Sequence, residues 1–149
     1  MVEIKNAAGN VILIYAGVDS LDFDSAELSG VNLKGAVLEG ANFSAANLAG
    51  ACLDDADLYW AIFFQANLCG ASLRHALLQG CDLKEADLSD ADLRGANFGP
   101  DNVGGFTQLE GANLSNCRIE EAVFEGATYD VKTILPVELD PESHKMKLV

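Results

Sequence analysis

Basic residues are scarce in this sequence, which holds nine Lys and Arg against 23 Asp and Glu, for a formal net charge of −14. Such a charge argues against non-specific binding to nucleic acid or anionic lipid, and it favours basic partners. Long apolar runs are also missing, since no stretch approaches the ~20 apolar residues that a membrane-spanning helix requires. We therefore expect a soluble chain without membrane contact or direct nucleic-acid binding.

Export signals and a cysteine framework are missing too. The opening residues MVEIKNAAGN lack the charged, apolar and small-residue order of a signal peptide, so we expect a cytoplasmic protein. The irregular spacing of the four cysteines fits neither a disulfide framework nor a CxxC metal site. We expect free thiols at Cys52, Cys69, Cys81 and Cys117.

Catalytic signatures are equally sparse. The sequence contains no Gly-rich phosphate loop, GxSxG or HExxH motif. Its two histidines, His75 and His144, have no nucleophile or metal-ligand set around them in the sequence pattern. We therefore expect no enzyme activity, no metal, no cofactor and no small-molecule substrate.

A five-residue repeat dominates the chain. From Ala16 to Pro100 the sequence divides into seventeen consecutive blocks, of which fourteen begin with Ala and sixteen have Leu or Phe third. A second run of five blocks begins at Thr107, and the register slips by one residue between the two runs. Repetition on this scale indicates one continuous solenoid rather than separate lobes.

The period of five indicates a bend in every block. Steps of 100° would carry the Leu residues around all sides of a helix, and an odd period would alternate them between the faces of a strand. If the last two residues of each block form a turn, the Ala and the Leu or Phe both point inward and the residue between them points outward. Gly at the fifth place, as in AELSG and VNLKG, suits that corner.

The blocks AELSG, ANFSA, ANLAG, ADLYW, ADLSD, ADLRG and ANLSN resemble the A(D/N)LXX motif of pentapeptide-repeat proteins. The resemblance covers about residues 16–131 and implies an all-β, right-handed quadrilateral β-helix with four blocks to each coil. Phe23, Phe43 and Phe63 recur every twenty residues, which agrees with four blocks per coil and predicts a stack of rings inside. At ~4.8 Å per coil, about six coils make a rod roughly 28 Å long.

Both ends of the solenoid are expected to be capped, because its core and backbone would otherwise be exposed. Residues 1–15, with the β-rich run at 11–15, are predicted to form an N-terminal β cap. Residues 132–149 are predicted to form a lid or short helix, with Asp140 as its cap and Pro141 as its first residue. Met146 and Leu148 either fold back onto the last coil or serve a dimer contact.

Residues 99–106 (GPDNVGGF) interrupt the repeat and contain the extra residue. The Gly and Pro content predicts a protruding bulge or small loop. It is either a tolerated insertion or a recognition loop, since function concentrates in such loops.

An apolar cluster interrupts the polar outward and corner places of the repeat. Such a cluster, with Trp and Tyr at its centre, is typical of contact with another chain, either a protein partner or a second copy in a homodimer. Shielding by the terminal segments and ordinary scattered surface residues are the alternatives. The cluster comprises Val37, Tyr59, Trp60, Ile62, Phe64 and Leu77.

An acidic set follows the outward places of three consecutive blocks and the corners between them. Residues 16–131 carry the whole net charge, with 19 acidic and five basic residues. The candidate acidic face comprises Asp82, Glu85, Asp87, Asp90 and Asp92. It is either solvated repeat surface or, as some members of the resembled family are thought to do, an imitation of DNA that occupies a type II topoisomerase such as gyrase.

The sequence therefore predicts a non-enzymatic interaction scaffold whose partner is not specified. An acidic DNA mimic that binds a type II topoisomerase is the alternative. A shape shared by a family does not identify the partner, so the choice depends on the surface.

Overall fold

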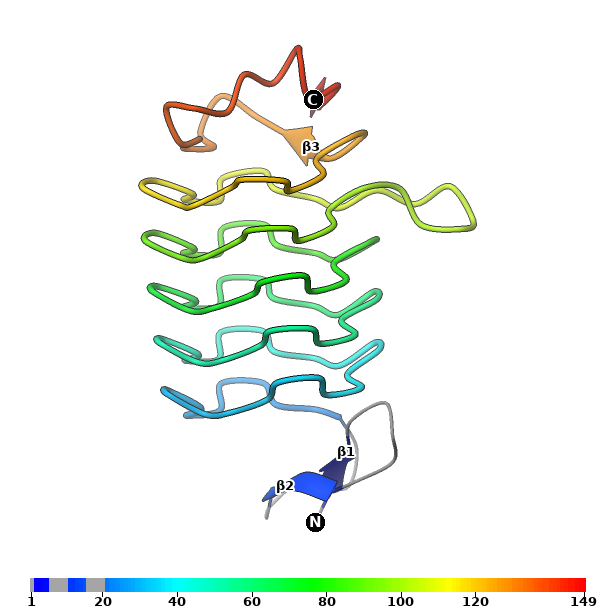
Figure 1. The fold of residues 1–149 in the computed structure, drawn as a ribbon, viewed down its shortest axis with the longest axis vertical. Helices are drawn as coiled ribbons and strands as arrows, with labels where there is room; N and C mark the ends of the chain where they lie inside the picture. The colour runs from blue at the N-terminus through cyan, green and yellow to red at the C-terminus, as the bar shows by residue number, and fades with distance from the viewer. Residues whose placement is uncertain (1, 6–10, 16–20) are drawn as a thin grey trace.

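A four-sided column is the main body of the computed structural model, which describes residues 2–5, 11–15 and 21–149, with side chains from residue 21 onward (Figure 1). The predicted block at 16–20 lies outside the described residues. Each face of the column is a parallel ladder to which every coil contributes one paired residue. From residue 22 to residue 97 the paired residues are twenty apart, which confirms four blocks per coil there, and they are 26 apart where segment 99–106 lies between them.

We number the four faces in chain order. Each is defined by the outward residues that pair from coil to coil. The ladders are face 1 with Asp22, Asn42, Ile62, Asp82, Gln108 and Thr128; face 2 with Glu27, Asn47, Asn67, Asp87, Asn113 and Ile134; face 3 with Asn32, Cys52, Ser72, Asp92 and Arg118; and face 4 with Val37, Asp57, Leu77, Asn97 and Val123.

One backbone pattern builds all four faces. The third residue of a block donates its N–H to the next coil, as Phe23 does to the Asn42 carbonyl at 2.7 Å. The second residue donates to the coil before, as Asn42 does to Leu21 at 2.8 Å. The first residue of the next block closes the turn, as Ala26 does on the Phe23 carbonyl at 3.0 Å. Because every block bends, most pairings are single-residue bridges, and regular strands are short.

The second residue of a block also explains the Asp and Asn preference of the motif. Its side-chain oxygen accepts the N–H of the fourth residue, as Asn67 does from Cys69 at 3.0 Å and Asp87 does from Ser89 at 3.0 Å. This bond occupies a turn N–H that has no other backbone partner, and short polar side chains are well suited to it.

The corners adopt left-handed backbone, which agrees with the Gly preference at the fifth place. Gly30 has φ of 66° there, and non-glycine residues such as Trp60 at 56° accept the same conformation. Glycine adopts that φ without the steric cost of a Cβ, whereas the other residues accept some strain to close the turn.

The core lies inside the column and consists of the first and third residues of the blocks. Phe23, Phe43 and Phe63 stack with ring centroids 5.0 Å apart, as predicted. A second stack, Phe98 on Phe124 at 4.6 Å, lies behind face 4. Cys81 and Cys117 are buried among these side chains, which confirms them as core residues.

The N-terminal segment forms a hairpin. Strand β1 (Val2–Lys5) pairs antiparallel with β2 (Val11–Tyr15). Figure 1 shows the hairpin at the N-terminal end of the column, beyond the first described coil. Its role as a cap stays a prediction.

The C-terminal segment returns to the column. Strand β3 (Thr128–Tyr129) pairs in parallel with β4 (Lys147–Leu148), so face 1 continues for one more step. Met146 packs against the core, whereas Leu148 is exposed. Met146 therefore folds back onto the last coil, whereas a dimer contact through Leu148 stays a prediction.

The predicted short helix at Pro141 is not formed. Residues 141–145 make a turn, in which Asp140 accepts the Ser143 N–H at 3.2 Å as a cap would. The turn stops after the Met146 N–H bonds to the Pro141 carbonyl, because the next residue pairs with β3. Across the described ranges 2–5, 11–15 and 21–149, no helix is long and apolar enough to cross a membrane.

Candidate protein-contact surface

The predicted apolar cluster spans one edge of the column, and we call it the apolar corner. Its members are Val37 and Leu77 on face 4, Tyr59 and Trp60 at the edge between faces 4 and 1, Ile62 on face 1 and Phe64 at the following corner. Tyr59 is half-buried, its ring 5.8 Å from that of Trp60 in an edge contact, and the other five are exposed. Asp57 lies between Val37 and Leu77 on face 4, so the apolar surface is interrupted there.

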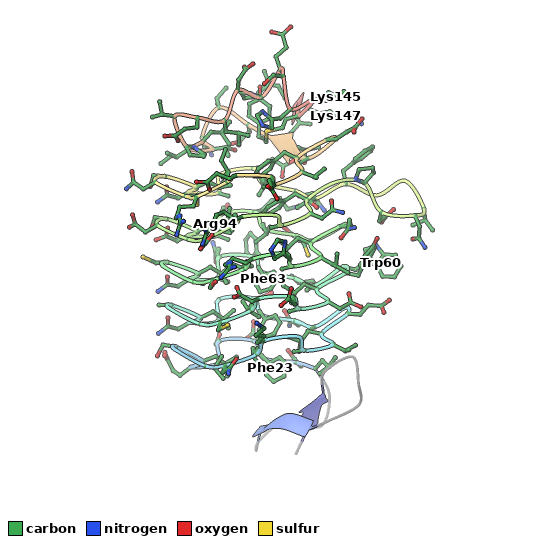
Figure 2. The ribbon with its side chains drawn as sticks, in the orientation of Figure 1. Phe23, Trp60, Phe63, Arg94, Lys145 and Lys147 are labelled. Atoms are coloured by element: carbon green, nitrogen blue, oxygen red, sulfur yellow. The ribbon has the colours of Figure 1, made fainter. Side chains whose placement is uncertain are left out.

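Trp60 is held in place at one side of the column, beside the protruding loop (Figure 2). Its indole N–H donates to Oδ2 of Asp101 at 2.7 Å, while 40% of the residue stays exposed. The ring lies over Gly80, one coil further on, where an added Cβ would collide with Cδ1 of the indole. The exposed aromatic side chain is therefore fixed rather than free to rotate.

Asp101 belongs to the segment 99–106, which protrudes from the column as predicted (Figure 1). Its Oδ1 accepts the N–H groups of Val103 at 2.9 Å and Gly105 at 2.6 Å. The hydrogen bond from Trp60 and those from the loop backbone hold the pKa of Asp101 below its usual value. One carboxylate thus shapes the loop and positions the tryptophan.

The other end of the loop is anchored to the C-terminal strand. Phe106 packs over Gly126, where an added Cβ would collide with its ring. The ammonium of Lys147 in β4 lies 3.5 Å from the centroid of the same ring, a cation–π contact. Between the two anchors, Val103 is 77% exposed. The loop therefore presents an apolar tip beside the apolar corner.

The sequence prediction missed this connection between the loop and Trp60. A signal was present, because Gly99 and Pro100 occupy the place in the repeat that Tyr59 and Trp60 hold forty residues earlier. Counting blocks would have placed the loop at the edge where Trp60 stands. The hydrogen bond itself depends on the loop conformation, which the repeat does not specify.

The predicted acidic set does not lie on one face. Asp82, Asp87 and Asp92 belong to faces 1, 2 and 3, because consecutive blocks occupy consecutive sides of the coil. The set therefore follows the chain around one coil, with Glu85 and Asp90 exposed at the intervening corners. A role in binding stays a prediction for these residues.

The three aspartates also have structural partners. Asp82 and Asp87 accept the turn N–H groups of Lys84 and Ser89, each at 3.0 Å. Asp92 pairs with Arg94 at 2.6 Å, and this contact lowers the pKa of its carboxyl group. Turn formation and local ion pairs thus give a structural reason for these three aspartates.

The histidines lie apart from one another. The ring of His75 covers Gly95, where an added Cβ would collide with it, and the ring of His144 meets Phe124 edge-on at 6.3 Å. Within the part of the chain that the structure describes, no group of three or more His, Cys, Asp or Glu residues could hold a metal ion.

The comparison with protein families decides the classification. The family described as pentapeptide repeats matches residues 22–58 and 61–99 in eight copies, which is just over half of the chain. The chain belongs to the pentapeptide-repeat family. A search of curated proteins found no match.

Several solved structures are similar to this pentapeptide-repeat protein. The pentapeptide repeat protein Rfr23 from the cyanobacterium Cyanothece 51142 is similar, with 29% identity and a TM-score of 0.63 over 77% of this chain and 91% of that one. HetL of Nostoc sp. strain PCC 7120, involved in heterocyst differentiation regulation, has 28% identity and a TM-score of 0.47 over 73% and 50%. QnrB1, a plasmid-mediated fluoroquinolone resistance protein, has 18% identity and a TM-score of 0.32 over 86% and 80%.

Proposed function

We propose that this pentapeptide-repeat protein is a non-enzymatic interaction protein that contacts a partner protein through the apolar corner. The observation that carries the proposal is the fixed position of Trp60, whose indole is bound to Asp101 while it remains 40% exposed. Tryptophan is among the residues that contribute most to protein interfaces, and a side chain already fixed loses little entropy on binding.

The surroundings of Trp60 support the same function. Ile62 and Phe64 extend the apolar surface along face 1, and Val103 adds an apolar tip from the loop. Exposed apolar patches of this kind are typical of contacts with other chains. Because the loop is anchored at Trp60 and at Lys147, the tip and the corner can contact a partner together.

No specific observation favours the DNA-mimic alternative. The aspartates of the predicted acidic set lie on three faces and take part in turns and ion pairs. A DNA mimic would be expected to present its charges along the axis of the column instead. The interaction proposal therefore rests on the apolar corner and not on the charge.

The proposal is tested by comparing Trp60→Asp with Val131→Asp, which introduces the same charge at an exposed apolar residue outside the apolar corner. Affinity capture from the source cells identifies partners, and light scattering measures self-association. We expect Trp60→Asp to lose the partner or the higher mass, and Val131→Asp to keep it. Unchanged association of Trp60→Asp in both measurements would contradict the proposal.

A gyrase supercoiling assay separates the alternative function. The interaction proposal predicts no inhibition at large molar excess of the protein. Inhibition that Trp60→Asp retains would favour the DNA mimic, because the acidic residues are unchanged in that variant.

A further inference from the structure

Faces 3 and 4 end one coil before faces 1 and 2. The ladder of face 3 stops at Arg118 and that of face 4 at Val123, whereas face 1 continues through β3 to Lys147 and face 2 continues to Ile134. The corner after face 4 is also covered, because the Gly126 N–H bonds to the Lys145 carbonyl at 2.9 Å. The C-terminal segment thus pairs with faces 1 and 2 and contacts the corner after face 4, and it leaves face 3 without a pairing segment.

The core is open at the same place. From residue 21 to residue 126, every third residue of a block is buried except Ile119, which is only half-buried. Cys117, the inward residue before it, is 6% exposed, whereas Cys81 is fully buried. The next inward residue, Ala122, is half-buried as well. An apolar floor therefore remains partly uncovered at the end of face 3.

The backbone at this end is in the conformation that pairs in every lower coil. The Leu93 N–H bonds to the Arg118 carbonyl at 2.8 Å, and the Gly95 N–H bonds to the Glu120 carbonyl at 2.9 Å. The matching donors one coil later are the N–H groups of Ile119 and Glu121. Among the residues that the structure describes, neither has a hydrogen-bond partner, and the Cys117 carbonyl accepts no hydrogen bond there.

A cavity of about 850 Å³ lies above this edge. Its floor includes Cys117, Ile119 and Ala122, and the C-terminal segment contributes Leu135 and Pro136 to the opposite wall. The volume is within the range of pockets that bind ligands. The cavity thus combines an apolar floor with backbone donors at the spacing of a β-ladder.

The charge at the rim indicates the kind of occupant. Three carboxylates line the cavity, from Glu120, Glu121 and Glu138, against one guanidinium, from Arg118. A segment with basic outward side chains would therefore complement the rim. Inward, the repeat itself shows what fits, namely a small residue followed two places later by Leu or Phe.

We propose that the open end of face 3 binds an extended basic segment of a partner protein by strand addition. The segment pairs in parallel with residues 117–121. Its carbonyl groups accept hydrogen bonds from the N–H groups of Ile119 and Glu121, and one of its N–H groups donates to the Cys117 carbonyl. Its aliphatic side chain covers Ile119. This mode obtains affinity from main-chain hydrogen bonds and selectivity from the alternating side chains.

A second copy of the chain fits this edge less well. The bridges along face 3 are parallel, whereas a two-fold related copy would bring its own edge in antiparallel. The C-terminal strand of the copy is also already paired with β3. An extended segment from another protein meets neither restriction.

The test uses the full chain and the peptide acetyl-AKLKGAKLKG-amide, which follows the repeat with Lys at the outward places. Backbone amide NMR is recorded during titration at physiological salt. We expect saturable shifts confined to residues 116–122 and 134–138, with slower hydrogen exchange at Ile119 and Glu121. The peptides acetyl-AKSKGAKSKG-amide, with equal charge but no Leu, and acetyl-AELEGAELEG-amide, with reversed charge, should not bind there.

Two variants test the contacts separately. Ile119→Pro removes one N–H donor and the aliphatic side chain, and should weaken binding by about tenfold or more. The double variant Glu120→Lys with Glu121→Lys keeps the floor and reverses the rim, so it should also weaken binding and remains informative if the proline variant does not fold. Glu39→Lys, an exposed site in the first described coil, is the charge control and should bind normally.

Four results would overturn the proposal. Saturable shifts could be absent, they could be centred on other faces, or the Ser-containing peptide could bind equally well. The fourth is protection of the Ile119 and Glu121 amides without peptide together with a doubled mass in solution, which would show that a second copy occupies the edge. The site lies apart from the apolar corner, so loss of the Trp60 contact leaves this result unaffected.

Discussion

The indole of Trp60 donates a hydrogen bond to Asp101, 41 residues further along the chain, at 2.7 Å. The bond joins a corner of the repeat to the segment that interrupts it. Because Asp101 also accepts the N–H groups of Val103 and Gly105, the geometry of the loop and that of the indole depend on the same carboxylate.

Acidification is expected to release Trp60 from Asp101. The pKa of Asp101 is lower in the folded chain than its ordinary value of about 3.9, because the carboxylate accepts hydrogen bonds from Trp60 and the loop. The stability that Asp101 contributes is therefore fully present above that ordinary pKa and is lost as pH falls through the lower folded-state pKa. Trp60 is the only tryptophan, so its fluorescence should change below about pH 4 while the circular dichroism stays folded.

The control for this titration is Asp101→Asn. The amide does not titrate, and its single oxygen can accept either the indole N–H or the loop N–H groups, so the fluorescence change with acid should disappear. An identical acid transition in this variant would show that another group controls Trp60.

Replacing Gly80 by Ala should displace the indole of Trp60. The new Cβ would collide with Cδ1 and Nε1 of the ring, whereas at Gly40, the same corner place two coils earlier, it would meet nothing within 4 Å. Both glycines have left-handed backbone, so each substitution should cost about 1 kcal/mol in the free energy of unfolding from strain alone. Only Gly80→Ala should cost more and shift the emission of Trp60. Equal effects in denaturant titrations of the two variants would contradict the packing of Trp60 on Gly80.

The repeat made much of this fold predictable. Because one rule applies to every block, the stack of Phe23, Phe43 and Phe63 and the burial of Cys81 followed from counting. The same counting, applied to faces, would have separated Asp82 from Asp92. Counting blocks cannot predict the contacts that residues outside the repeat make.

The candidate sites depend on such contacts. The bond between Trp60 and Asp101 requires the conformation of a loop that occurs once in the chain. The open edge at Ile119 requires knowledge of which faces the C-terminal segment covers. In both cases the repeat determines the positions available on the column, and a non-repeating segment determines which of them are exposed.

The carboxylate of Asp87 should matter as a hydrogen-bond acceptor more than as a charge. It accepts the Ser89 N–H at 3.0 Å and the Asn113 side-chain amide at 3.2 Å. Asp87→Asn keeps an oxygen for the turn and should change the free energy of unfolding little, whereas Asp87→Ala should lower it by about 1 kcal/mol. Chemical denaturation of the two variants measures the difference. A larger loss in the Asn variant would indicate that the negative charge itself is required.

The four thiols should divide into two classes. Cys81 is fully buried and donates to the Leu58 carbonyl at 2.9 Å, and burial raises its pKa. Burial raises the pKa of Cys117 to about 12, and its thiol bonds to the Leu88 carbonyl. Since the thiolate is the reactive form, a disulfide reagent at pH 8 should modify the half-buried Cys52 and Cys69 first.

The order in which the two buried thiols react tests whether the column is open at the end of face 3. Cys117 lies at the open end of face 3 and Cys81 lies further inside, so Cys117 should react before Cys81 in the variant with Cys52→Ser and Cys69→Ser. Mass spectrometry after timed quenching gives the order, and full reaction of both should require denaturant. Because Cys81 is fully buried, a reagent can reach it only when neighbouring coils unfold. Reaction of Cys81 before Cys117 would therefore show that the column opens at a place other than the end of face 3.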